Sequence, residues 1–155
     1  MNVRLKRLYA DHQQVTKIFG NHPNIRLIEA IGTPPERYII EFLLNGLTGE
    51  NEEEIAIINS HRAEIYLTLD YPRRPPFCRM LTPIFHPNIN PQKICIGDHW
   101  NAGQALTQLI IRIGEMICFQ SFNVQSPLNA KAAVWAEKNI SSLPLDRCDL
   151  QKEIC

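Results

Sequence analysis

A proline-rich stretch in the middle of the chain, residues 71–95, brings together the residue types that could do chemistry. It reads YPRRPPFCRMLTPIFHPNINPQKIC, and its chemically useful groups are the amide of Asn88 and the thiol of Cys95. Prolines fix φ and remove backbone donors, so this stretch is predicted to follow a rigid, mostly irregular path. A rigid segment that presents one amide and one thiol is a suitable place for chemistry.

The cysteine content favours free thiols over disulfides or metal ligands. There are five cysteines, an odd number, and no two of them are spaced as CxxC. Free thiols are typical of a reducing compartment. Cys78 and Cys118 lie in apolar runs and are expected to be buried, whereas the sequence assigns no role to Cys148 and Cys155.

Length and charge indicate one domain over residues 1–155 without a strongly charged surface. The chain has 16 Lys and Arg against 16 Asp and Glu, so its formal net charge is zero. This balance argues against nucleic acid or a membrane surface as the main partner. No apolar run in the sequence approaches the roughly 20 residues that span a bilayer, and cations at residues 4–7 interrupt any signal-peptide core. We therefore expect a cytoplasmic protein.

Periodicity predicts the elements that must position the amide and the thiol. Apolar residues recur at helical spacing in three segments and alternate as in strands in three others. The predicted helices cover residues 3–19, 105–119 and 129–139. The predicted strands cover residues 24–31, 37–44 and 55–69, the last being one long strand or two short ones. Thr107 and Asn129 are candidate N-caps, and the tail over residues 140–155 is polar.

The order of these motifs resembles the centre of a ubiquitin-conjugating enzyme, which carries a tyrosine-proline turn, a His-Pro-Asn motif and a nucleophilic cysteine. The matching residues are Tyr71, Pro72, Pro75, Pro76, His86, Pro87, Asn88 and Cys95. A tryptophan before Ala-Leu-Thr at residues 100–107, and Pro-Leu before an alanine-rich helix at residues 127–136, also match. The resemblance covers about residues 1–139. It implies an α+β fold with an N-terminal helix, a four-stranded antiparallel meander, an active-site loop and two or three C-terminal helices.

The resemblance implies acyl transfer through Cys95. The thiol would accept ubiquitin or a ubiquitin-like protein as a thioester from an activating enzyme and pass it to an amine of a target protein. A thiolate is a strong nucleophile and its thioester stays reactive toward amines, so no cofactor, metal or strong base is expected. Asn88 would stabilise the oxyanion of the reaction, or hold the loop through backbone hydrogen bonds.

Other residues receive supporting roles from the same resemblance. Ser126 would orient the incoming amine, or only form the turn before Pro127. His86 is expected to brace the loop, while Asp98 and His99 would tune the site or belong to a plain solvated loop.

Partner binding is expected at the basic first helix. Arg4, Lys6 and Arg7 would dock the activating enzyme and often a ligase, or form a solvated helix face. The segment over residues 101–104 lacks the serine-proline pair that contacts RING-type ligases in the family, so any ligase is not expected to be an ordinary RING type. These departures suggest an atypical member, and a prokaryotic ubiquitin-like system is the expected setting.

Two other classes of function are compatible with parts of the pattern. The chain could be a catalytically inactive variant of the same fold that binds a ubiquitin-like protein or a partner enzyme, although such variants usually lack the cysteine. It could also be a cysteine hydrolase that pairs Cys95 with His86 or His99, but the sequence offers no third residue to orient the histidine.

Overall fold

The first helix begins and ends where the sequence predicts. The computed structural model describes residues 2–96 and 100–151. In it, α1 spans Val3–Phe19, and the Asn2 side chain caps it by accepting a hydrogen bond from the Leu5 N–H at 2.8 Å. Its buried face carries Leu8, Val15 and Phe19, together with the carboxyl group of Asp11.

A four-stranded antiparallel sheet follows α1. Its strands are β1 (Ile25–Gly32), β2 (Pro35–Phe42), β5 (His61–Tyr66) and β6 (Phe77–Met80), and they lie in the order β1-β2-β5-β6. The first two strands confirm the prediction to within two residues. The fourth strand, β6, lies within the proline-rich stretch, which is otherwise as irregular as predicted. The apolar run that starts at Phe77 is long enough to pair with β5 before the next proline.

The predicted strand region over residues 55–69 forms two strands, of which β5 belongs to the four-stranded sheet and the other pairs in a separate two-stranded sheet with a strand that the sequence did not predict. The strands of this separate sheet are β3 (Gly46–Thr48) and β4 (Ala56–Ile58), and an acidic turn joins them. The region is therefore divided between β4 and β5, which decides between the two alternatives that the sequence left open.

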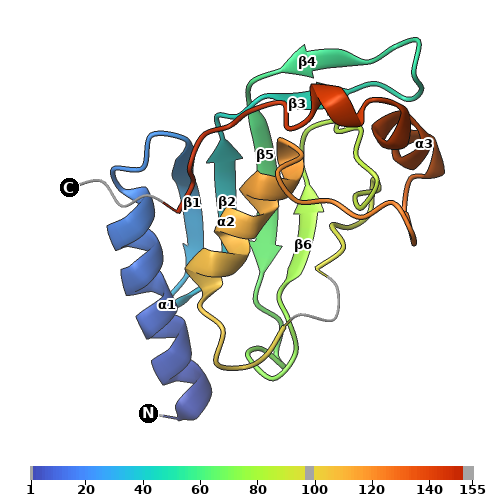
Figure 1. Cartoon of the computed structure of the whole chain (residues 1–155). Helices are drawn as coiled ribbons and strands as arrows, with labels where there is room; N and C mark the ends of the chain where they lie inside the picture. Colours follow the sequence, from blue (N-terminus) through green and yellow to red (C-terminus); the bar gives the residue numbers. More distant parts are fainter. Residues whose placement is uncertain (1, 97–99, 152–155) are drawn as a thin grey trace.

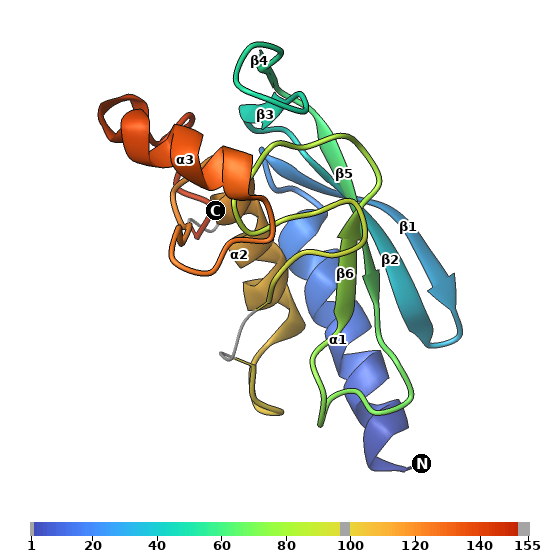
Figure 2. The same ribbon diagram turned by 90° about the vertical axis from the view of Figure 1, so that its right-hand side faces the viewer.

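Helices α1 and α2 cover one face of the four-stranded sheet, as Figures 1 and 2 show, and no described helix covers the opposite face. Helix α2 spans Leu106–Ile117, and its apolar stripe is buried against the sheet. The prediction that Thr107 caps this helix is wrong, because the N-cap is Ala105. Thr107 lies inside the first turn, where its side chain is buried.

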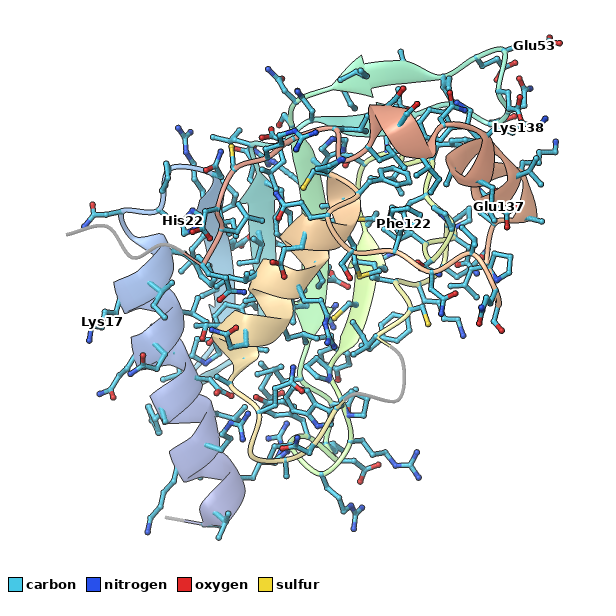
Figure 3. The ribbon with its side chains drawn as sticks, in the orientation of Figure 1. Lys17, His22, Glu53, Phe122, Glu137 and Lys138 are labelled. Atoms are coloured by element: carbon cyan, nitrogen blue, oxygen red, sulfur yellow. The ribbon has the colours of Figure 1, made fainter. Side chains whose placement is uncertain are left out.

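The C-terminal part packs back onto this core. Helix α3 spans Ala130–Lys138, and the Asn129 side chain caps it by accepting from the Ala132 N–H at 3.0 Å, as predicted. A 3-10 turn, η2 (Ile140–Ser142), follows. Further on, Leu150 is buried in the core, and its carbonyl lies 3.0 Å from Nε2 of His22, which Figure 3 labels beside the end of α1. None of the described helices combines the length and the apolar character needed to cross a membrane.

Candidate active site

Cys95 is the exposed thiol among the cysteines that the structure describes. Burial raises the pKa of Cys78 and Cys118, to about 11 for Cys118, so these two thiols are poor nucleophiles at neutral pH. The half-buried Cys148 also has a raised pKa, chiefly because of its hydrogen bond with Asp146. The thiol best suited to react with another protein is therefore Cys95.

The chain just before the thiol is held by backbone hydrogen bonds. The Cys95 N–H donates to the Asn88 carbonyl at 2.9 Å, and the Ile94 N–H donates to the Cys78 carbonyl at 2.8 Å. Ile89 and Ile94 form an isolated antiparallel bridge, and both side chains are buried. Residues 89–95 therefore form a narrow hairpin, the thiol hairpin, whose two isoleucines are anchored in the core. Cys95, at the end of this hairpin, faces solvent.

Asn88 joins this hairpin to a distant loop. Its Oδ1 accepts from the Asn123 N–H at 2.9 Å, and its Nδ2 donates to the Asn123 carbonyl at 2.8 Å. The residue is 8% exposed. An asparagine amide has two N–H donors, so these bonds use the acceptor and one donor. The amide is thus fixed in one orientation, on a residue whose backbone carbonyl binds the Cys95 N–H.

His86 supports the same loop as a neutral residue. Its ring is fully buried, and Nδ1 accepts from the Asn88 N–H at 3.0 Å. Burial lowers the pKa of His86 to about 3, and the Met116 carbonyl opposes this shift only in part. The ring packs against Phe119, with the centroids 4.6 Å apart and the ring planes tilted by 42°. Phe119 in turn contacts Phe122, which Figure 3 shows between α2 and α3. A buried imidazole in this position cannot serve as an exposed general base.

Ser126 lies in the loop that the His-Pro-Asn segment holds at both ends. The Asn88 side chain holds the loop at Asn123, and the Pro87 carbonyl accepts from the Leu128 N–H at 2.8 Å. Between these two points Ser126 is exposed. The structure therefore brings the loop of Ser126 next to Asn88, although the two are far apart in the sequence.

The three cations of α1 lie in different environments. Arg4 Nη2 donates to the carbonyls of residues 67 and 68, and Nη1 pairs with Glu36 at 3.3 Å. Arg7 is paired with Asp11 at 2.9 Å. Lys6 is exposed. The two arginines thus bind within the chain, and Lys6 is the cation of the three that a partner can reach freely. Asp98 and His99 lie outside the described residues.

A buried cluster around Asp11 was missed by sequence analysis. The Tyr71 hydroxyl donates to Asp11 Oδ2 at 2.5 Å, and the Trp100 Nε1–H donates to the Pro72 carbonyl at 2.8 Å. Burial raises the pKa of Asp11, while the Tyr71 hydroxyl and Arg7 oppose the shift. The sequence contained a signal for this cluster. Asp11 lies at helical spacing from the core residues Leu8 and Val15, and a buried carboxyl group needs a hydrogen-bonding partner.

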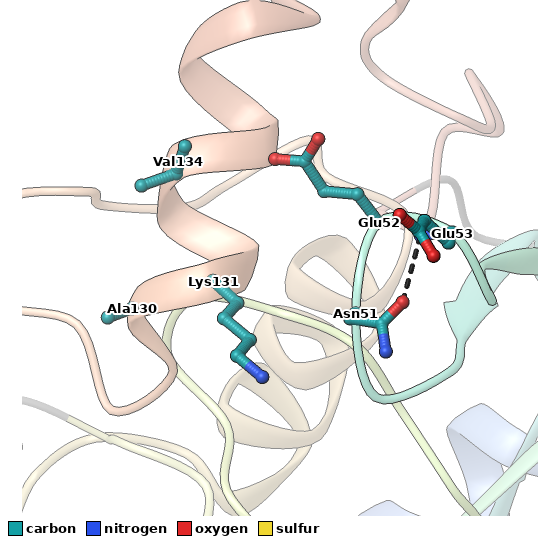
Figure 4. Close-up of a pocket in the computed structure, with 6 residues that line it drawn as sticks. All are labelled: Asn51, Glu52, Glu53, Ala130, Lys131 and Val134. Atoms are coloured by element: carbon teal, nitrogen blue, oxygen red, sulfur yellow. Dashed lines mark hydrogen bonds between the residues drawn. The ribbon is translucent and has the colours of Figure 1, made fainter.

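The surface carries several hollows, which differ in how near they lie to the thiol. One, of about 550 Å³, is lined by apolar side chains before the His-Pro-Asn segment and by Ile89, Asn90 and Pro91 within the thiol hairpin. Another, of about 570 Å³, lies between the acidic β3–β4 turn and α3, as Figure 4 shows. Its lining, which includes Glu52, Lys131 and Val134, contains no residue of the thiol hairpin. The first hollow thus adjoins the candidate site, as does a third hollow of about 620 Å³ that Pro91 and Gln92 line.

Sequence comparison places the chain in a known protein family. The profile of the family described as ubiquitin-conjugating enzyme matches residues 59–143, more than half of the chain. Ubiquitin-conjugating enzyme E2 3 from Arabidopsis thaliana is 33% identical over 73 residues, which make up 44% of this chain and 47% of that protein. The chain thus matches about half the length of this curated relative.

Structural comparison shows the same fold. A structure described as a novel ubiquitin-conjugating enzyme has a TM-score of 0.63 at 21% identity, over 88% of this chain and 86% of the other. A ubiquitin-conjugating protein from Trypanosoma cruzi has a TM-score of 0.65 at 16% identity, over 88% and 92%. These similarities confirm the expected N-terminal helix, four-stranded antiparallel sheet and C-terminal helices. With the profile match, they show that the chain belongs to the ubiquitin-conjugating enzyme family.

Proposed function

We propose that this protein is a ubiquitin-conjugating-type acyl carrier whose nucleophile is Cys95. The observation that carries the proposal is the exposed thiol at the end of a hairpin anchored in the core, with its backbone N–H bound to Asn88, whose side-chain amide is fixed. An inactive binding module would not need this arrangement. The hydrolase alternative is weakened because the nearest described histidine in sequence, His86, is buried and neutral.

The reaction consists of two acyl transfers. In the first, the Cys95 thiolate attacks the thioester carbonyl on the activating enzyme, a new C–S bond forms, and the thiolate of the activating enzyme leaves. In the second, an amine of the target attacks the Cys95 thioester. The C–N bond forms, the C–S bond breaks, the amine proton passes to water or a nearby base, and the Cys95 thiolate is restored.

Asn88 and Ser126 support the second transfer in this proposal. The Asn88 Nδ2 has one N–H beyond the bond to Asn123, and this donor can stabilise the negative oxygen of the tetrahedral intermediate. A single donor of this kind contributes roughly 3 kcal/mol in measured enzymes. Ser126, exposed on the loop that Asn88 holds, orients the incoming amine and accepts a hydrogen bond from it.

The partners are a ubiquitin or ubiquitin-like protein, an activating enzyme, a target protein and, where one is needed, a ligase other than an ordinary RING type. Lys6 on α1 supplies the exposed positive charge for docking the activating enzyme. Arg4 and Arg7 support this surface indirectly, because they bind backbone carbonyls of later segments and so fix α1 against them. A prokaryotic ubiquitin-like system as the setting is a prediction that rests on the divergence of the sequence.

The test is a charging reaction with ATP, the activating enzyme and the ubiquitin-like protein. We expect an adduct that reductant removes in the native protein, and no adduct in Cys95→Ala. A reductant-sensitive adduct that persists in Cys95→Ala would assign the chemistry to another thiol, and the proposal would be wrong.

A further inference from the structure

Arg7 connects three segments of the chain at one point. Its Nε donates to Asp11 on α1 at 2.9 Å, its Nη1 donates to the Ala102 carbonyl, and its Nη2 donates to the Gln104 carbonyl at 2.6 Å. Its side chain is 19% exposed. The guanidinium group therefore ties the first helix to the segment that follows the thiol in the sequence.

Aromatic side chains complete the contacts of this guanidinium. It lies 5.1 Å from the centroid of the Tyr71 ring and 6.0 Å from that of Trp100, within the range of cation–π attraction. The two rings are 5.7 Å apart, and Trp100 is bound in turn to the Pro72 carbonyl. The Tyr71–Pro72 turn, the Trp100–Gln104 segment and α1 are thus held together around Arg7.

We infer that Arg7 is a positioning residue for acyl transfer: its guanidinium fixes the Trp100–Gln104 segment, the first described segment after the thiol hairpin. The hairpin itself is held by the backbone bonds of Ile94 and Cys95. The contribution to acyl transfer rests on the proposed function, whereas the fixing of the segment does not.

The geometry requires arginine specifically. A guanidinium presents donors in a planar fork and can bind a carboxylate and two carbonyls at once while its face lies on aromatic rings. A lysine ammonium keeps the charge but cannot reach all three acceptors in this arrangement. Arg7→Lys therefore removes the fixation while leaving the net charge unchanged.

Arg37→Lys is a matched control on the uncovered face of the sheet. Arg37 pairs with the Glu64 carboxylate at 3.0 Å and lies 4.4 Å from the centroid of the Tyr66 ring, so it also combines an ion pair with a cation–π contact. Among the described residues, Arg37 forms no hydrogen bond or ion pair with the Trp100–Gln104 segment. A general loss of arginine contacts would affect both variants alike.

The first measurement is the fluorescence of Trp100 in the uncharged protein. The chain has two tryptophans, so Trp135→Phe serves as the background. With Arg7→Lys we expect the Trp100 emission to move to longer wavelength and its quenching by acrylamide to increase, because the indole loses a packed neighbour. With Arg37→Lys we expect no change in either quantity.

The second measurement is single-turnover discharge of the preformed thioester to free lysine, without activating enzyme or ligase. We expect Arg7→Lys to slow discharge by about fivefold to tenfold, since small displacements of reacting groups are costly in rate, and Arg37→Lys to match the native rate. Equal quenching and equal discharge in the two variants would overturn the inference.

If the fluorescence of Arg7→Lys changes and its discharge rate does not, Arg7 only stabilises the fold, and its positioning role is wrong. If the native protein forms no thioester, the proposed function fails, and the fluorescence result still decides whether Arg7 fixes the segment.

Discussion

Replacing Asn88 by alanine separates the two roles that its amide can have. The variant loses both side-chain hydrogen bonds to the backbone of Asn123, at 2.8 and 2.9 Å. It also loses the second N–H of the amide, which the proposed mechanism uses as an oxyanion donor. The first loss acts on the stability of the fold. The second acts on the rate of acyl transfer to an amine.

The expected size of each effect follows from the contacts. Two hydrogen bonds at about 1 kcal/mol each give a loss of about 2 kcal/mol in the free energy of unfolding. For a chain of this length, that loss corresponds to a decrease in Tm of about 4–8 °C. Loss of an oxyanion donor costs about 3 kcal/mol in the barrier, a factor of roughly 10² in rate. Since domains are typically stable by about 5–15 kcal/mol, the variant remains folded and the rate loss cannot come from unfolding.

The assay follows charging and discharge separately. Thermal unfolding monitored by circular dichroism gives the Tm of Asn88→Ala, and single-turnover gels give the rate of thioester formation and the rate of discharge to free lysine. We expect thioester formation close to the native rate and discharge slower by roughly 10²-fold. We expect a selective loss because the activating enzyme also surrounds the oxyanion during charging, whereas in discharge to free lysine the donors come from this chain alone.

Asn24→Ala is the matched control for stability. The half-buried Asn24 side chain donates to the Leu43 carbonyl at 3.1 Å, far along the chain from the thiol hairpin. This variant should also lose stability but keep both rates. If Asn88→Ala slows charging and discharge by equal factors, or slows neither, the oxyanion role is refuted and only the tie to Asn123 remains.

Three further changes test the surrounding loops. Burial holds the pKa of His86 at about 3, below its usual 6.5, so on acidification the unfolded chain binds this proton before the folded protein does. The free energy of unfolding therefore falls as the pH drops below about 6.5, by up to about 1.4 kcal/mol per pH unit. His86→Asn, which can still accept from the Asn88 N–H, should flatten this slope in urea titrations at several pH values; an unchanged slope would contradict the assignment. Ser126→Asp should speed discharge to lysine and Ser126→Ala should slow it, and equal rates in single-turnover assays would remove Ser126 from the mechanism. Asn129→Ala loses the cap of α3 and should lower the free energy of unfolding by about 1 kcal/mol in urea denaturation; no loss would mean that the cap bond to Ala132 contributes nothing.

The local patterns of the sequence predicted much of the fold because they depend on near neighbours. Helical spacing of Leu8, Val15 and Phe19 was sufficient to place α1, and Asn129 was recognised as a cap from the helix that follows it. The small β3–β4 sheet was harder, since strands of three residues show too little alternation to be distinguished from a loop.

Contacts between distant segments were beyond prediction from spacing. Arg4 and Arg7 looked like a docking surface, because nothing in α1 reveals that carbonyls of later loops bind their guanidinium groups. The docking of the tail through Leu150 and His22 is of the same kind. The candidate nucleophile and its amide could be named from their motif, whereas the bond of Asn88 to Asn123 required the structure.

The most direct test of the carrier hypothesis is to locate the bond that forms during charging. The hydroxyl variant Cys95→Ser is charged with the ubiquitin-like protein, digested and sequenced by tandem mass spectrometry. We predict an oxyester that resists reductant and maps to position 95. A bond that maps to any other position, with position 95 unmodified, would contradict the account.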